Sequence, residues 1–70
     1  MAQNETAHLV SMAGDITANL AVHADAEERI ADHLQRFWAP RMRTLLIEHA
    51  HLHPDDLPAL LRAALGRLQG

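Results

Sequence analysis

With 70 residues and no cysteine, this chain has room for one domain at most, and neither a disulfide nor a thiolate metal site can reinforce its core. A formal net charge of −3 and the lack of lysine argue against the dense basic face that binds nucleic-acid phosphates. No apolar run approaches about 18 residues and no basic, apolar leader opens the chain, so we expect a soluble cytoplasmic protein without a membrane span or secretory signal.

The charge is divided unevenly along the chain. Residues 1–34 carry six acids and one Arg (−5), whereas residues 35–70 carry five Arg and three acids (+2). Opposite charges on the two halves suit an antiparallel, self-packed domain. A core of this size rarely contributes more than about 3–5 kcal/mol, so we expect a partner, self-association or a modest helical core.

The first helical pattern spans residues 5–22, where apolar residues recur at steps of three and four. Asn4 or Thr6 can cap its start. The face predicted to be buried comprises Leu9, Met12, Ala13, Ile16 and Leu20.

A second helix is predicted to begin at Asp25, because Glu28 three residues later gives a capping-box-like start. It continues to about residue 38. Acid-to-base pairs spaced four residues apart stabilise helices, and two of them lie on its outer side: Asp25–Arg29 and Asp32–Arg36.

The apolar face of this second helix predicts which aromatic residue is buried. Ile30, Leu34 and Phe37 share that face, so we assign Phe37 to the core. Trp38 lies about 80° round from Ile30 at 100° per residue. We therefore expect Trp38 on the flank of the helix, where it stays available to a partner.

Pro40 separates the second helix from a third. Because proline lacks an amide hydrogen and disfavours helical geometry at the preceding residue, the second helix is predicted to end near Ala39. Pro40 can then serve as the first residue of a helix over roughly 41–51. Residues 36–43, called the corner below, contain the only Phe, the only Trp, three of the six basic residues and no acid.

The third helix is apolar on more than one side, which indicates a central position or a second contact surface. Leu46 and Ile47 lie away from the side formed by Met42, Leu45, His49 and Leu52.

A turn at residues 53–56 leads to a fourth helix, which Asp55 or Asp56 is predicted to cap. The chain therefore predicts an all-α fold, a small bundle of three to four short helices with a Pro40 corner, in a single domain over residues 1–70. The apolar stripe of the fourth helix comprises Leu57, Leu60, Leu61, Ala64, Leu65 and Leu68.

His49 and His53 form the one constellation that suggests chemistry. Spaced four residues apart, they could chelate a metal on a helix face, but a third protein ligand would require Asp55 or Asp56 to fold back. Otherwise these imidazoles interact with the unpaired carbonyls of a helix C-terminus. A helical chain of this size has little room for a pocket of about 300–1,000 Å³, so we assign no catalytic residue and no activity of its own.

The corner is the best candidate for binding another protein. Tryptophan and arginine are enriched at interface hot spots, and the corner itself contains no acid. We predict a docking patch for a larger protein that comprises Arg36, Trp38, Arg41, Met42 and Arg43.

Residues 30–43 read I-A-x-H-x-x-R-F-W-x-P-R-M-R. With L-V-S-M-A at residues 9–13 and the leucine-rich helix near 57–68, this pattern resembles the delta subunit of soluble NAD-dependent formate dehydrogenases. The resemblance covers roughly residues 8–68.

The resemblance implies a non-catalytic accessory subunit of a cytoplasmic molybdenum or tungsten enzyme, which oxidises formate to carbon dioxide and passes electrons to NAD. It implies that the chain stabilises the catalytic alpha subunit or aids its maturation, with beta and gamma subunits in the same complex. Molybdopterin (bis-MGD), iron–sulfur clusters, FMN and NAD are expected on the other subunits and none on this chain, which has no cysteine for iron–sulfur ligation.

Three alternatives stay open on the residues alone. One is a small DNA-binding or antitoxin-like helical protein that places Arg36, Arg41 and Arg43 on phosphates. Another is a metal-binding module built on His49 and His53. The last is a homodimer that uses the additional apolar side of the third helix.

Overall fold

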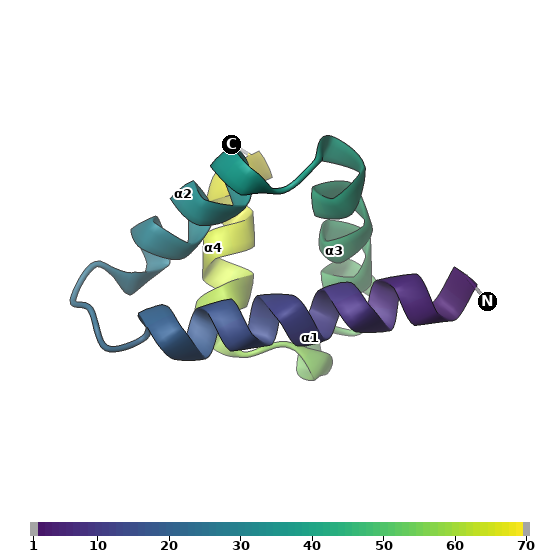
Figure 1. Ribbon diagram of the computed structural model, residues 1–70. Helices are drawn as coiled ribbons and strands as arrows, with labels where there is room; N and C mark the ends of the chain where they lie inside the picture. The colour runs from purple at the N-terminus through teal and green to yellow at the C-terminus, as the bar shows by residue number, and fades with distance from the viewer. Residues whose placement is uncertain (1, 70) are drawn as a thin grey trace.

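The computed structural model describes the backbone of residues 2–69 and the side chains of residues 5–68, and these residues contain no strand. The predicted all-α fold is therefore confirmed (Figure 1). The elements are α1 (Ala2–Leu20), α2 (Ala26–Phe37), α3 (Pro40–Leu52), the 3-10 turn η1 (Pro54–Asp56) and α4 (Ala59–Gln69).

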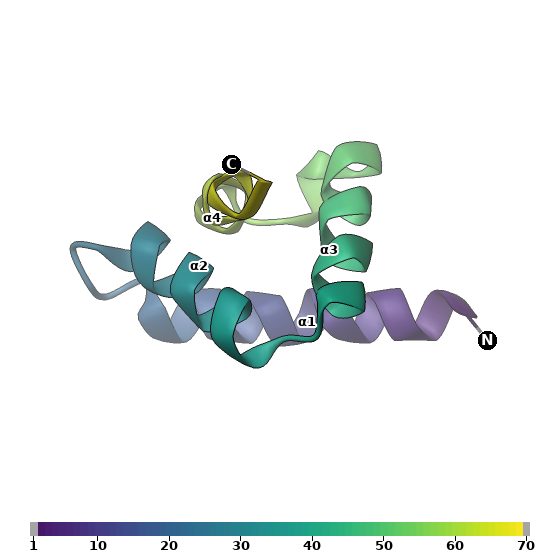
Figure 2. The same ribbon diagram turned by 90° about the horizontal axis from the view of Figure 1, so that it is seen from above.

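The longest helix, α1, lies along one side of the molecule, and α2, α3 and α4 all pack on the same side of it (Figure 1). Contacts join α2 to α4, and α1 contacts each of α2, α3 and α4. Seen from above, α4 is viewed nearly end-on, with α2 on one side and α3 on the other (Figure 2). The corner is the connection that carries the chain from α2 into α3.

The core forms where these helices meet, and most of the predicted apolar stripes contribute to it. On α1, Leu9 and Ala13 are buried, while the other predicted residues of that helix are half-buried against the core. Leu46 of α3 is fully buried, with half-buried apolar neighbours on either side, as expected for a helix that is apolar on more than one side. The largest fully buried side chains are Ile30, Leu34, Leu46, Leu61 and Leu65.

Thr17 is a buried polar residue on α1 that the apolar pattern does not predict. Its Oγ1 donates a hydrogen bond of 2.8 Å to the carbonyl oxygen of Ala13, one turn earlier. Because this bond satisfies the hydroxyl within the helix, the remaining methyl group can pack in the core without leaving a polar group unpaired.

The assignment of the two aromatic side chains from helical angles was wrong. Phe37 is 72% exposed, whereas Trp38 is 5% exposed and belongs to the core. The helix ends at Phe37, and Trp38 is extended (φ −96°, ψ 139°), so the angle of 100° per residue does not apply to Trp38.

The predicted capping residues of three helices also need correction. α1 begins at Ala2, so Thr6 lies inside the helix, and the side chain of Asn4 lies outside the described residues. Asp25 precedes α2 but makes no side-chain cap. Instead, its Oδ1 accepts a hydrogen bond of 2.6 Å from Arg29 Nε, which lowers the pKa of the Asp25 carboxyl.

Neither Asp55 nor Asp56 caps the fourth helix, because both lie in η1 and α4 begins at Ala59. The residue before a proline is disfavoured in helical geometry. Leu57 therefore stays extended before Pro58 (φ −120°, ψ 142°), and its side chain is buried.

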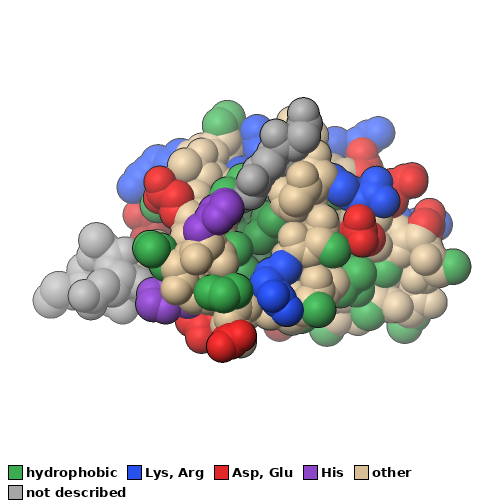
Figure 3. Space-filling model, turned by 180° about the vertical axis from the view of Figure 1, so that it is seen from behind, with side chains coloured by type: hydrophobic (Ala, Val, Ile, Leu, Met, Phe, Trp, Pro, Cys, Tyr) green, Lys and Arg blue, Asp and Glu red, His purple; other side chains and the backbone are tan. Residues whose placement is uncertain are grey.

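The surface mixes charges of both signs. On the face seen from behind, basic and acidic side chains alternate, with hydrophobic side chains between them (Figure 3). No helix among the described residues is long and apolar enough to cross a membrane.

Candidate interaction surface

The corner is a short, extended connection between two helices. Trp38 and Ala39 both have extended backbone, and Pro40 opens α3 as predicted. The Trp38 amide donates to the carbonyl of Leu34 at 3.1 Å, and the Arg43 amide donates to the carbonyl of Ala39 at 3.1 Å. The end of α2 is thus linked to the start of α3 by only two residues.

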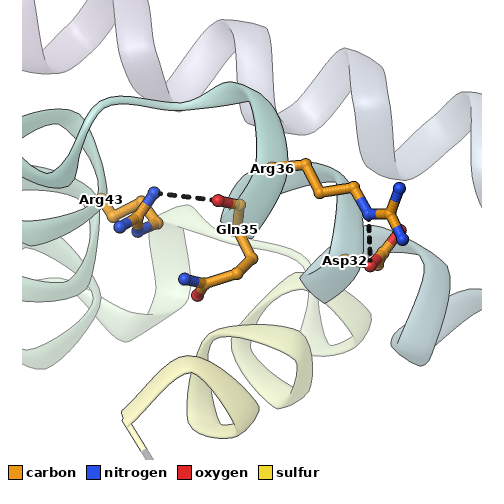
Figure 4. Close-up of polar contacts among 4 residues, drawn as sticks. All are labelled: Asp32, Gln35, Arg36 and Arg43. Carbon is orange, nitrogen blue, oxygen red and sulfur yellow. Dashed lines mark hydrogen bonds and ion pairs between the residues drawn. The ribbon is translucent and has the colours of Figure 1, made fainter.

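Arg43 fastens the two helices together. Its Nη1 donates to the carbonyl oxygen of Gln35 at 3.3 Å (Figure 4). The same nitrogen donates to the carbonyl oxygen of Leu34 at 3.4 Å and to that of Trp38. The last carbonyls of a helix have no partner within the helix and carry partial negative charge. A guanidinium from the first turn of α3 supplies the missing donors, so Arg43 stabilises the corner from within the chain.

The predicted docking residues therefore occupy four different environments. Trp38 is in the core, Met42 is half-buried against it, and Arg43 is bound to the end of α2. The side chains of Arg36 and Arg41 are 70% and 67% exposed. Binding of a partner by this set stays a prediction, but the premise that Trp38 is available on the flank of α2 was wrong.

The two exposed arginines, Arg36 and Arg41, each form an ion pair on the surface. Arg36 Nε donates to Asp32 at 2.9 Å on the outer side of α2, as the four-residue spacing predicts (Figure 4). Arg41 Nη2 reaches Glu5 on α1 at 3.4 Å. The Arg41–Glu5 pair connects residues 36 positions apart, so sequence spacing could not indicate it.

Residues 8–65, which include the whole corner, match the family model of the NADH-dependent formate dehydrogenase delta subunit FdsD. The chain belongs to this family. No curated protein and no solved structure gives a significant match. The resemblance read from the sequence is thereby confirmed, and the chain is a formate dehydrogenase delta subunit by family.

In this delta-subunit chain the two candidate metal ligands lie side by side. The ring centroids of His49 and His53 are 5.0 Å apart, and His49 Nε2 lies 3.0 Å from Asp56 Oδ2. Among the described residues, however, no group of three or more His, Cys, Asp or Glu side chains could hold a metal ion. The contact between His49 and Asp56 instead joins the end of α3 to η1.

A second surface feature of the delta-subunit chain is a groove between α1 and the far end of α3. Its volume is about 350 Å³, and Leu52 beside it is 74% exposed. The groove is lined by Thr6, Ala7, Leu45, Glu48, His49, Leu52 and His53.

Proposed function

We propose that this chain is a non-catalytic accessory subunit of a cytoplasmic NAD-dependent formate dehydrogenase, and that it stabilises the catalytic alpha subunit or aids its maturation with molybdopterin. The family match over residues 8–65 supports this proposal. The chain acts by contact, through the surface of a small helical bundle. Its partner is the alpha subunit, in a complex that also holds beta and gamma subunits.

The cofactors of such a complex fit the other subunits better than this chain. We propose that bis-MGD with molybdenum or tungsten, iron–sulfur clusters and FMN lie there, and that they oxidise formate and reduce NAD. Iron–sulfur clusters are held by cysteine thiolates, and this chain has no cysteine.

Mass action explains how a small, non-catalytic subunit can stabilise the native state of a large enzyme. A partner that binds only the native state stabilises it, by about 2.7 kcal/mol when its concentration is 100 times the dissociation constant. Part of the surface of this chain is already fixed, because Arg43 holds the corner in place before any partner arrives. Less conformational freedom is then lost on binding.

Formate dehydrogenase purified from cells that lack this chain is expected to contain less molybdenum or tungsten, or to lose activity faster at elevated temperature, than the complete complex. Metal analysis and the half-life of formate oxidation measure the two effects. Adding purified chain to the finished enzyme distinguishes the roles: a restored half-life indicates stabilisation, whereas a metal deficit that only co-expression repairs indicates maturation. Equal activity, metal content and half-life with and without the chain would contradict the proposal.

A further inference from the structure

The corner presents an apolar surface that the fold leaves uncovered. Phe37 is 72% exposed, and Ala39 and Pro40 across the turn are also exposed. The ring of Phe37 lies against His33, with ring centroids 4.9 Å apart. An aromatic side chain has a large apolar area to bury, and Phe37 ends α2 at a position where another molecule can reach it.

Two cationic side chains flank this apolar surface. Arg36 precedes Phe37, and Arg41 follows Pro40. Arg36 bonds its carboxylate partner through Nε and Arg41 through Nη2, and a guanidinium has five N–H donors. Because exposed ion pairs contribute little, carboxylates of a partner can add to these pairs or replace them.

The start of α3 adds to the positive potential. A helix N-terminus carries partial positive charge and favours acidic side chains. The first turn of α3 has no acid and no side-chain cap, and Arg41 and Arg43 lie there instead. Carboxylates brought by another protein would therefore find a favourable field at the corner.

We propose that Phe37, flanked by Arg36 and Arg41, inserts into an apolar recess on the alpha subunit of formate dehydrogenase, and that aspartate or glutamate side chains line the rim of that recess. This proposal rests on the proposed function, since it names the surface through which the accessory subunit acts. Phe37 takes the role of aromatic anchor that the sequence suggested for Trp38. The rigid hold of Arg43 on the end of α2 positions Phe37 for insertion.

Two variants test this docking surface: Phe37→Ser, and the double variant Arg36→Glu with Arg41→Glu. Each full-length chain is titrated against a formate dehydrogenase complex purified without this subunit, after circular dichroism has shown that it is folded. Both variants are expected to weaken binding by roughly tenfold or more, as for residues at an interface hot spot. High salt is expected to weaken binding of the unmodified chain, because the flanking contacts are ionic.

Two matched control variants replace a different exposed apolar residue by serine. Val22→Ser alters a residue that is 83% exposed after α1, and Leu52→Ser alters one that is 74% exposed beside the groove. Both are expected to bind like the unmodified chain. Unchanged binding by the Phe37→Ser and double-arginine variants would overturn the docking surface and leave the proposed function standing, and a loss confined to Leu52→Ser would move the interface to the groove. If the unmodified chain bound duplex DNA and no formate dehydrogenase subunit, both proposals would fall.

Discussion

Replacing Trp38 by alanine is expected to unfold most of the isolated chain under conditions where the unmodified chain is folded. Trp38 is 5% exposed and packs in the core. Truncation of a buried aromatic side chain typically costs about 3–5 kcal/mol. That loss is as large as the whole stability that a core of this size usually provides, about 3–5 kcal/mol.

Phe37→Ala is the matched control for this prediction, since it removes a neighbouring aromatic side chain that is 72% exposed. Surface substitutions usually change stability by less than about 0.5 kcal/mol. Thermal and urea unfolding followed by circular dichroism measure both variants. A larger loss for Phe37→Ala than for Trp38→Ala would show that Phe37 is the core residue after all.

Replacing Arg43 by alanine is expected to lower the free energy of unfolding by about 1.5–3 kcal/mol, the range for hydrogen bonds to charged groups. The change removes the donors that bind the carbonyls of Leu34, Gln35 and Trp38. It also removes one of the two positive charges, with Arg36, near the negative end of α2. Urea unfolding provides the measurement.

Two further arginine variants identify the source of the effect. Arg36→Ala removes an exposed pair within one helix, so it is expected to cost only about 0.2–0.5 kcal/mol. Arg43→Lys keeps the charge, but its ammonium lies on a shorter side chain than the Nη1 that makes all three contacts, so its stability should lie between Arg43→Ala and the unmodified chain. If Arg43→Ala and Arg36→Ala lost equal stability, Arg43 would not act as a clamp.

Helical periodicity was sufficient to predict much of this fold. Ile30 and Leu34, and likewise Leu61 and Leu65, are four residues apart and all fully buried, because side chains at that spacing share a face within a continuous helix. The two four-residue ion pairs on α2 follow from the same rule. Pro40 fixed the start of α3 for an equally local reason, its missing amide hydrogen.

Periodicity failed where the helix ends or where distant residues meet. Trp38 is one residue past α2, so its extended backbone and not the helical angle sets its direction. Arg43 is visible in the sequence only as one of three corner arginines, and its role depends on how α3 folds back. Arg67 and Glu27 form an ion pair of 2.6 Å across 40 positions, which depends on the packing of α4 against α2.

The candidate site was likewise predicted only in part. The sequence indicated the corner as a surface with arginines and an aromatic anchor, and Arg36 and Arg41 are indeed exposed there. It could not indicate which aromatic ring faces outward, because that depends on the single residue at which α2 ends. Phe37 could have been predicted as the exposed ring only if the last residue of α2 had been placed correctly. The ends of a helix are its least certain feature when it is predicted from sequence.

The central claim is that this chain works by binding the other subunits of formate dehydrogenase. Affinity purification of the tagged chain from cells that express all subunits, followed by mass spectrometry and subunit quantification, tests the claim most directly. The account predicts that the alpha subunit is retained in a fixed ratio to the chain, and that the complex remains intact through size-exclusion chromatography. Recovery of the chain without any formate dehydrogenase subunit, from cells in which the assembled enzyme is present, would contradict it.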